Sequence, residues 1–369
     1  AWVRTFNEQR EIFGKKIINT NSFVSETWLQ CYETINICNN ILSALSVVDV
    51  EDRDRVEGEA KFIRGLMYFE LVKLFAQPYS AGDVASNPGV PIVLQPTRKI
   101  SEESKISRAT VQTTYNQIIS DLSVAEEKLP EENDVFATKT AAAAILSRVY
   151  LQQEDFDNAR DAANRAIEYG TNSLTPTFAE AFNNDDNSSE DIFALQVNEQ
   201  DGDNSMHTYW SVPDFGGRDG DVEVLDNHVA LYSLGDDRLN LFYDGNSARR
   251  SGKWQLQFKN IPIVRLAEMY LTRAEANFRL GTSVGDTPLN DINLIRSRVN
   301  LAPLVSVTLP NILLERKLEL AHEGQTVHDA KRLRQTIEGL PFNDPKLVLP
   351  IPQRERNVNG NLAQNDGYN

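Results

Sequence analysis

Three glutamates near the C-terminal end of the sequence are spaced so that one face of a helix would carry them all. Glu315, Glu319 and Glu323 are four residues apart, and such positions lie on one side of a helix. Two carboxyl groups across a cleft perform glycoside hydrolysis as acid and base. Three arginines are close in sequence: Arg316, Arg332 and Arg334. We therefore interpret the glutamates as structural residues that form salt bridges to these arginines.

A second pair of carboxylates, Glu268 and Glu275, lies seven residues apart on another expected helix. The pair could face one cavity, but its neighbours follow the pattern of a packed helix, so we interpret it as structural too. The sequence contains no Gly-x-Ser-x-Gly motif, no phosphate-binding Gly-Lys-Ser/Thr loop and no dinucleotide-binding glycine pattern. These features predict a protein that is not an enzyme and that uses no cofactor.

The histidines are scattered and do not have the spacing of a metal site. Zinc sites use pairs four residues apart on a helix, or short Cys/His spacings. The sequence has neither of these among its four histidines: His207, His228, His322 and His328. No metal site is predicted.

Aromatic residues within a polar stretch suggest a binding surface for sugars. Tyr209, Trp210 and Phe215 occur among Asp, Asn and Gly, where a buried strand or helix would show periodic aliphatic residues. Sugars present apolar C–H faces rimmed by hydroxyls, so a carbohydrate site combines aromatic rings with hydrogen-bonding side chains. Asp214 and Arg218 would supply the hydrogen bonds. The alternative is that these rings fasten the polar stretch to the rest of the fold.

Charge and hydropathy exclude two classes of partner. The 369 residues have a net charge of −16, which would repel a phosphate backbone, so nucleic acid is not an expected partner. The longest apolar run is Ala141 to Leu146, far short of the roughly 20 residues that a membrane helix needs.

The two cysteines are not expected to form a disulfide. Cys31 and Cys38 would lie about 10 Å apart on one helix, too far for a disulfide.

Hydrophobic periodicity predicts a mainly helical protein. Apolar residues repeat at helical spacing in residues 28–45, 60–74 and 111–129. The stretch from Ala141 to Gly170 resembles a tetratricopeptide helix pair, and residues 266–296 follow a similar pattern. Pro78 to Ser107 is a long connection punctuated by proline and glycine.

We predict an all-α fold built from tetratricopeptide-like helix pairs in a superhelical scaffold, with few short strands. Strands are expected at Ile192 to Val197 and Trp254 to Phe258. We expect one domain, residues 1–369, with three parts: a helical part at 1–170, a loop-rich insertion at 171–260 and a helical part at 261–369.

Several sequence blocks closely resemble the SusD/RagB family of outer-membrane nutrient-binding proteins. The first is Arg265-Leu266-Ala267-Glu268 followed by Tyr270-Leu271 and Arg273-Ala274-Glu275-Ala276. The later blocks follow in order: Ile295-Arg296-Ser297-Arg298, Glu315-Arg316-Lys317-Leu318-Glu319-Leu320, Glu323-Gly324, and the ending Leu349-Pro350-Ile351-Pro352 with Gln364-Asn365 and Gly367-Tyr368. The N-terminal half is similar to the family through Gly89-Val90-Pro91.

The resemblance implies a function. The protein would be a lipid-anchored lipoprotein on the outside of the outer membrane, with the anchor outside this sequence. It would bind an oligosaccharide and deliver it to a SusC-like TonB-dependent transporter, without cleaving it. The alternative is a tetratricopeptide-type scaffold that holds a peptide or protein partner in its concave surface. Exposed aromatic residues would favour sugar, and a groove lined with Asn and Lys would favour peptide.

Two further residues complete the expected ligand site. Tyr79 begins the long Pro/Gly connection, a region in which the resemblance also implies ligand contacts. Trp254 is a lesser candidate, because Leu256 and Phe258 alternate with glutamines and Trp254 could be the inward-facing start of a strand. The predicted site is therefore Trp210 first, then Tyr209, Asp214, Arg218, Trp254 and Tyr79.

Overall fold

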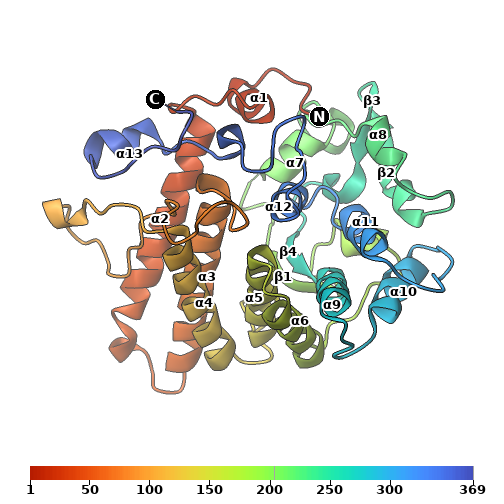
Figure 1. Cartoon of the computed structure of the whole chain (residues 1–369), viewed down its shortest axis with the longest axis horizontal. Coiled ribbons are helices and arrows are strands. Elements are labelled where there is room, and N and C mark those ends of the chain that lie inside the picture. The colour runs from red at the N-terminus through yellow and green to blue at the C-terminus, as the bar shows by residue number, and fades with distance from the viewer. Residues whose placement is uncertain (203, 369) are drawn as a thin grey trace. The chain divides into compact units, whose positions relative to one another are not determined.

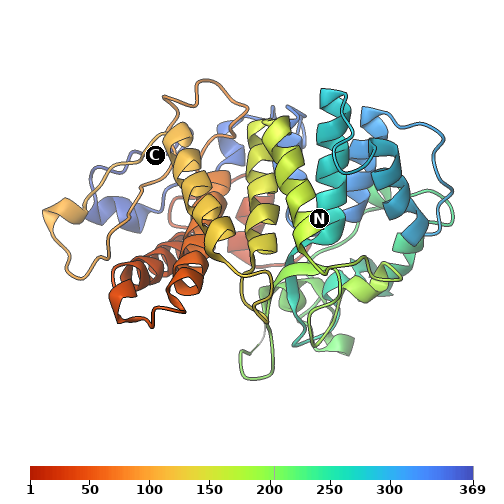
Figure 2. The ribbon, with the colours of Figure 1, turned by 90° about the horizontal axis from the view of Figure 1, so that it is seen from below.

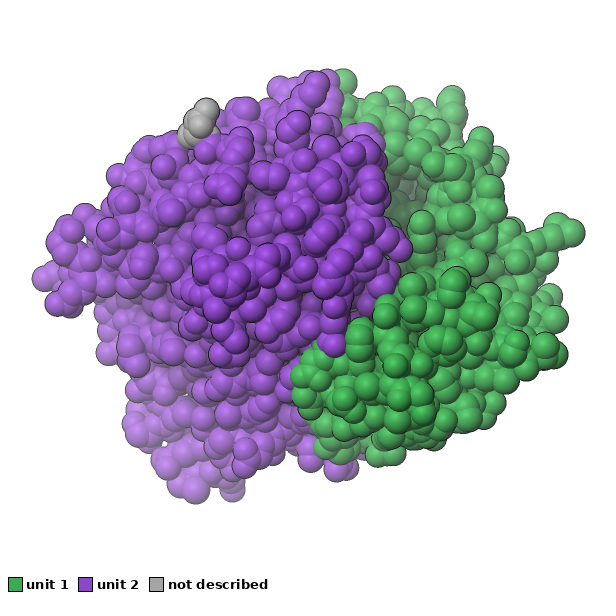
Figure 3. Space-filling view, viewed as in Figure 1, with its two compact units in different colours: residues 1–5, 134–136, 155–326 green, residues 6–133, 137–154, 327–369 purple. Residues whose placement is uncertain are grey.

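The computed structural model describes residues 1–202 and 204–368. The described chain forms two compact units (Figure 3). Unit 1 comprises residues 1–5, 134–136 and 155–326, and unit 2 comprises residues 6–133, 137–154 and 327–369. These units do not test whether the chain folds as one domain, so the expected single domain with parts 1–170, 171–260 and 261–369 stays a prediction.

Unit 2 is helical. Its α-helices are α1 (Asn7–Phe13), α2 (Ser22–Leu42), α3 (Arg53–Phe75), α4 (Val111–Lys128), α5 (Lys139–Gln153), α12 (Thr326–Arg332, whose first residue belongs to unit 1) and α13 (Gln353–Val358). Its 3-10 turns are η1 (Leu45–Val47), η2 (Glu102–Ser104) and η7 (Pro345–Leu347). The helix starts follow local chemistry, since the side chains of Asn21, Thr110 and Thr138 accept hydrogen bonds from the first turns of α2, α4 and α5.

Helices α2, α3 and α4 pack in sequence order, and α5 packs on α4 (Figures 1 and 2). A Cβ on Gly65 would lie 2.9 Å from the side chain of Leu122, so glycine allows α3 and α4 to approach closely. The buried Arg64 of α3 donates to both carboxylate oxygens of Asp121 on α4, at 2.8 and 2.7 Å, and to Asn39 of α2 at 2.8 Å. This bidentate contact ties three helices together.

Unit 1 combines helices with two small sheets. Its α-helices are α6 (Phe156–Tyr169), α7 (Ser205–Trp210), α8 (Asp226–Val229), α9 (Leu266–Leu280), α10 (Pro288–Arg298) and α11 (Leu309–Glu319). Its 3-10 turns are η3 (Ala179–Ala181), η4 (Pro213–Phe215), η5 (Asp237–Leu241) and η6 (Gly252–Trp254). Its strands are β1 (Asp191–Leu195), β2 (Phe242–Gly245), β3 (Ala248–Ser251) and β4 (Ile261–Arg265).

Helix α9 is the centre of unit 1, because α6, α10 and α11 all pack against it. The core between them is aliphatic: Ala267, Leu271, Ala274, Ile292, Ile295, Ile312 and Leu320. Strands β1 and β4 pair antiparallel, and so do β2 and β3, which Asn246 and Ser247 join in left-handed conformations. A two-residue turn with positive φ angles matches the twist of a hairpin.

The expected fold class is confirmed: the described chain is mainly helical, with tetratricopeptide-like helices such as α9 and α10 and few short strands. The strand predicted near Ile192 is β1. The strand predicted from Trp254 to Phe258 is wrong. Residues 252–254 form η6, Phe258 has a φ of 55°, and Leu256 is 39% exposed. The alternating pattern there reflects turns and not an extended segment with one buried face.

Candidate functional site

Helix α7 carries two of the predicted ligand residues, Tyr209 and Trp210, and both of its ends are anchored. At its start, the side chain of Asn204 accepts a hydrogen bond from the backbone N–H of His207 at 2.9 Å. At its end, the hydroxyl of Ser211 donates to the carbonyl of Gln255 at 2.8 Å. A helix of six residues has little stability by itself, so these contacts determine where the two aromatic rings lie.

Trp210 belongs to a group of rings contributed by distant parts of the chain. Its ring centroid lies 4.9 Å from that of His322, with the two planes tilted by 49°. His322 in turn lies 5.2 Å from His228 and 6.0 Å from Phe242. Tyr232 completes the group, since its ring lies 5.4 Å from His228 and 5.6 Å from Phe242. We call these five residues the aromatic cluster.

Hydrogen bonds hold the cluster in place. The hydroxyl of Tyr232 lies 3.2 Å from the carbonyl oxygen of Leu318 and 3.3 Å from Nε2 of His228. His322 has a φ of 69°, and its carbonyl accepts the indole N–H of Trp254 at 3.1 Å. A left-handed conformation costs a histidine energy that the surrounding contacts must supply.

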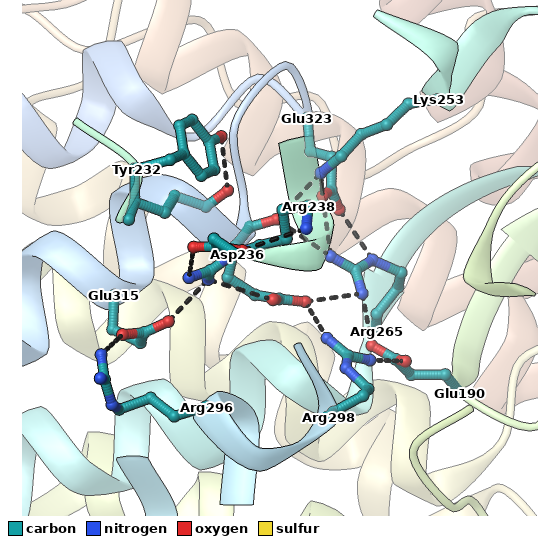
Figure 4. A network of polar contacts seen from close by, with 12 residues as sticks. Glu190, Tyr232, Asp236, Arg238, Lys253, Arg265, Arg296, Arg298, Glu315 and Glu323 are labelled. Carbon is teal, nitrogen blue, oxygen red and sulfur yellow. Dashed lines mark hydrogen bonds and ion pairs between the residues drawn. The ribbon is translucent and has the colours of Figure 1, made fainter. Parts of the chain in front are cut away.

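Glu323, the residue after His322, belongs to a network of buried charges (Figure 4). Glu323 accepts hydrogen bonds from Arg265 at 2.9 and 2.8 Å and from Lys253 at 2.5 Å. Lys253 also donates to the carbonyl of Glu319 at 2.9 Å. Burial lowers the pKa of Lys253 to about 8, although Glu323 opposes that shift. Hydrogen bonds therefore hold the chain both before His322, at Glu319, and after it, at Glu323.

The network extends through the row of glutamates predicted from the sequence. Arg265 and Arg298 both contact Glu319 and Glu190, while Arg238 binds Glu315 at 2.6 Å. Arg296 contacts Glu315 at 3.3 Å and Asp236 binds Arg238 at 2.7 Å. Burial alone would raise the pKa of Glu319, but the surrounding arginines, Arg298 first, lower it to about 2.

The prediction that the glutamates form salt bridges to arginines is confirmed. The prediction that these arginines are Arg316, Arg332 and Arg334 is wrong. Arg316 binds Glu268 at 3.2 Å, Arg332 binds Asp329, and Arg334 binds Glu154. Side chains one position apart on a helix do not face each other, so Arg316 does not pair with Glu315. The arginines that contact Glu315 and Glu319 come from β4, α10 and η5 instead.

The remaining predicted site residues have different surroundings. Tyr209 packs edge-on against Trp2, with ring centroids 5.5 Å apart. Asp214 is exposed in η4, and Arg218 binds Asp221 at 2.7 Å. Tyr209 thus precedes Trp210 on α7, Asp214 and Arg218 follow it in the chain, and none of the three has a ring contact with the aromatic cluster among the contacts that the structure describes.

Trp254 and Tyr79 are placed elsewhere. The Trp254 side chain is buried, with 6% exposed, and its N–H is already bonded, so we interpret it as a residue that supports His322. Tyr79 lies in unit 2, where its ring packs edge-on against Tyr115 at a centroid distance of 4.9 Å.

Comparison with known proteins identifies the family. Residues 2–151 match a family model described as starch-binding and associating with the outer membrane, and residues 238–341 match the SusD family model. The chain belongs to the SusD/RagB family. SusD-like protein P2 of Formosa agariphila is 26% identical over 99% of this chain and 84% of its own length.

Other SusD proteins agree with this assignment. A SusD superfamily protein of Bacteroides thetaiotaomicron has a TM-score of 0.87 and 25% identity, over 99% of this chain and 91% of that one. The starch-binding protein SusD of the same species is 37% identical over 123 residues, which are 30% of this chain and 22% of that protein. Membership of the SusD family supports a role in glycan binding and nutrient uptake.

Three further observations on this SusD/RagB protein concern membrane helices, metal ligands and the second carboxylate pair. Within residues 1–202 and 204–368, no helix has the length and apolar character needed to cross a membrane. Among the same residues, no three His, Cys, Asp or Glu side chains are grouped so that they could hold a metal ion. Glu268 and Glu275 are engaged by Arg316 and Arg279, at 3.2 and 2.9 Å.

Sequence reasoning missed four members of the aromatic cluster: His228, Tyr232, Phe242 and His322. Three of them lie in the same polar insertion as Trp210, so the excess of rings in residues 171–260 was the available signal. His322 had no such signal, because it lies in the loop after α11 and contacts Trp210 only through the tertiary fold.

Gly217 passes close to the residue that follows Trp210. A Cβ on Gly217 would lie 2.4 Å from the carbonyl carbon of Ser211 and 2.5 Å from its oxygen. Gly217→Ala must therefore displace Ser211 and, with it, Trp210. We expect a loss of about 1 to 3 kcal/mol in the free energy of unfolding, together with weaker ligand binding, measured by denaturation and calorimetry. Gly360→Ala, where nothing lies within 4 Å of the new Cβ, is the control, and equal behaviour of the two variants would contradict the prediction.

His228 makes the stability of the protein depend on pH. Burial, helped by Lys317 and Lys253, lowers the pKa of His228 from 6.5 to about 4. Between these two values the unfolded chain binds a proton that the folded protein does not, so this contribution to stability falls as the pH falls. We expect a loss of about 1 to 2 kcal/mol, less than the full shift implies because the ring is only partly buried.

Comparison with His228→Gln isolates this effect. Burial also raises the pKa of Asp191 to about 6, and Asp191 contributes with the opposite sign over part of the same range. Urea denaturation of both proteins between pH 7 and pH 4 should show the wild type losing more stability than the variant. Parallel curves would show that His228 is not the group that titrates.

Proposed function

We propose that this protein captures an oligosaccharide outside the outer membrane and delivers it to a SusC-like TonB-dependent transporter without cleaving it. The observation that carries the proposal is the aromatic cluster, in which a partly exposed Trp210 is held by α7 and by His322. An indole face matches the apolar C–H face of a sugar, and a ring fixed in advance loses little freedom on binding.

The family relationship supports the class of ligand and the location. One relative is named a starch-binding protein, and the N-terminal family model is described as associating with the outer membrane. A lipid anchor outside this sequence would attach the protein there. Recovery of a TonB-dependent β-barrel transporter with the tagged protein, from membranes of the native host, tests the partnership. Repeated recovery without such a transporter would contradict it.

The state of the carboxylates supports binding without cleavage. The glutamates that could have formed an acid and base pair are engaged by arginines or lysine in the buried network. A glycan array followed by isothermal titration calorimetry should show binding, and a reducing-end assay on the bound glycan should show no release of sugar. Release that is abolished by Glu319→Gln would overturn this part of the proposal.

The alternative of a peptide-binding scaffold would be favoured by a groove lined with Asn and Lys. In unit 1, a groove of about 630 Å³ lies along α6, α9 and α10. Asn290 and Asn293 line it, but no lysine does, and the amide of Asn293 is already bonded to the backbone of Leu304 at 2.8 and 3.0 Å. This groove does not favour a peptide over a sugar.

A further inference from the structure

An exposed lysine lies close enough to the aromatic cluster for its charge, in addition to burial, to lower the pKa of His228. Lys317 is exposed on α11 and precedes Leu318, whose carbonyl accepts the hydroxyl of Tyr232. In the part of the chain that the structure describes, Lys317 has no hydrogen bond or ion pair. Its ammonium group can therefore bind a ligand without first breaking a contact.

The two glutamates that lie nearest to His322 in the sequence are already neutralised. Glu323 follows His322 directly but is bound by Arg265 and Lys253. The next glutamate of the row, Glu319, is bound by arginines. The two cluster histidines add no charge at neutral pH, since burial lowers the pKa of His228 to about 4 and that of His322 well below its ordinary value. Among the described residues, Lys317 is thus an exposed charge without an ion pair that lies close enough to His228 to add to the lowering of its pKa by burial.

This local charge is opposite in sign to the charge of the whole protein. The net charge of −16 repels an anionic ligand at long range, but salt screens that repulsion beyond about 8 Å. Within that distance, the nearest unpaired charge has the largest electrostatic effect on the ligand. A lysine ammonium donates a charge-assisted hydrogen bond to any sugar oxygen, but only a carboxylate or sulfate adds the attraction between opposite charges.

We propose that the glycan captured at the aromatic cluster is acidic, with uronate carboxylates or sulfate esters, and that Lys317 binds its anionic group while Trp210 contacts a sugar face. This inference rests on the proposed glycan-binding function. The arrangement separates two tasks: the ring recognises the apolar face that most sugars share, and the lysine selects those that carry a negative charge at the rim.

Matched pairs of ligands test the charge directly. Oligomers of galacturonate, of mannuronate and guluronate, and of sulfated galactose would be titrated against the protein, each beside a counterpart neutralised by methyl esterification or desulfation. We expect at least one acidic oligomer to bind about tenfold more tightly than its neutral counterpart at 50 mM salt, and this preference should decrease at 300 mM salt. Comparing the uronate oligomers with the sulfated oligomers shows whether the protein prefers carboxylate or sulfate groups.

The variant Lys317→Gln assigns the preference to one residue. We expect it to weaken binding of the acidic oligomer about threefold to tenfold and to leave binding of the neutral counterpart unchanged. Lys99→Gln is the matched control, because Lys99 is also exposed, has no partner within the described residues and changes the net charge equally. Circular dichroism confirms that both variants fold.

The possible failures are distinguishable. If neutral oligomers bind as tightly as acidic ones, or if Lys317→Gln and Lys99→Gln have equal effects, the inference is overturned while glycan binding stands. If no oligosaccharide binds in the ligand pairs or on the glycan array, the proposed function fails together with the inference.

Discussion

Replacing Arg265 with methionine is expected to lower the free energy of unfolding by about 3 to 5 kcal/mol, the effect of removing one partner from a buried ion pair. The Arg265 side chain is fully buried and contacts Glu190, Glu319 and Glu323. Without its charge, three buried carboxylates keep only their remaining partners, and each must either lose stabilisation or take up a proton. Guanidinium denaturation followed by circular dichroism measures the change.

Arg249→Met is the control for Arg265→Met. Arg249 binds Asp226 at 2.7 Å, but the side chains are 35% and 97% exposed, so this pair should contribute under about 1 kcal/mol. Arg265→Lys adds a second comparison, since it keeps the charge but loses the planar fork that reaches several carboxylates at once. If Arg265→Met is no less stable than Arg249→Met, the network does not hold this part of unit 1 together.

Replacing Trp210 with alanine is expected to weaken glycan binding about tenfold to a hundredfold, the loss of roughly 1 to 3 kcal/mol of aromatic contact. The ring is partly exposed, and no hydrogen bond of the helix α7 depends on it, so the fold should survive. Isothermal titration with the cognate glycan measures the affinity, and circular dichroism checks the helices.

Phe278→Ala is the matched control for Trp210→Ala, because it also removes a partly exposed ring from unit 1, on helix α9, where the ring is 37% exposed. It should leave the affinity unchanged. If Trp210→Ala binds the glycan normally with its helices intact, Trp210 has a packing role, and the search for the ligand site moves to Tyr79 in the long connection of unit 2.

The two predictions are connected through His322. The Trp210 ring contacts His322, whose neighbour Glu323 is bound by Arg265 and Lys253. We therefore expect Arg265→Met to weaken glycan binding as well as stability, because a loosened loop would let the ring move away from its binding position. A variant that loses stability without losing affinity at low temperature would show that the two properties are independent.

The sequence by itself determined the helices, the family and the first ligand candidate. Helix α4 spans Val111–Lys128, in agreement with the apolar repeat predicted over residues 111–129, and Thr110 caps its start. Such signals are local, since periodicity and caps act within a few residues. Trp210 was also selected from a local signal, a ring in a polar stretch, and its role in ligand binding stays a prediction. The strand predicted at Trp254 failed because alternation over five residues also occurs in turns.

Only the tertiary structure decided which residues meet. Glu319 is neutralised by Arg265 and Arg298 and not by Arg316, three residues before it. Trp210 meets His322, which is more than a hundred residues away in the sequence. The sequence shows that buried charges need partners, but several arginines could satisfy each glutamate. The packing of β4, α10 and α11 around one buried site selects among them, because ion-pair energy depends on distances that only the folded chain sets.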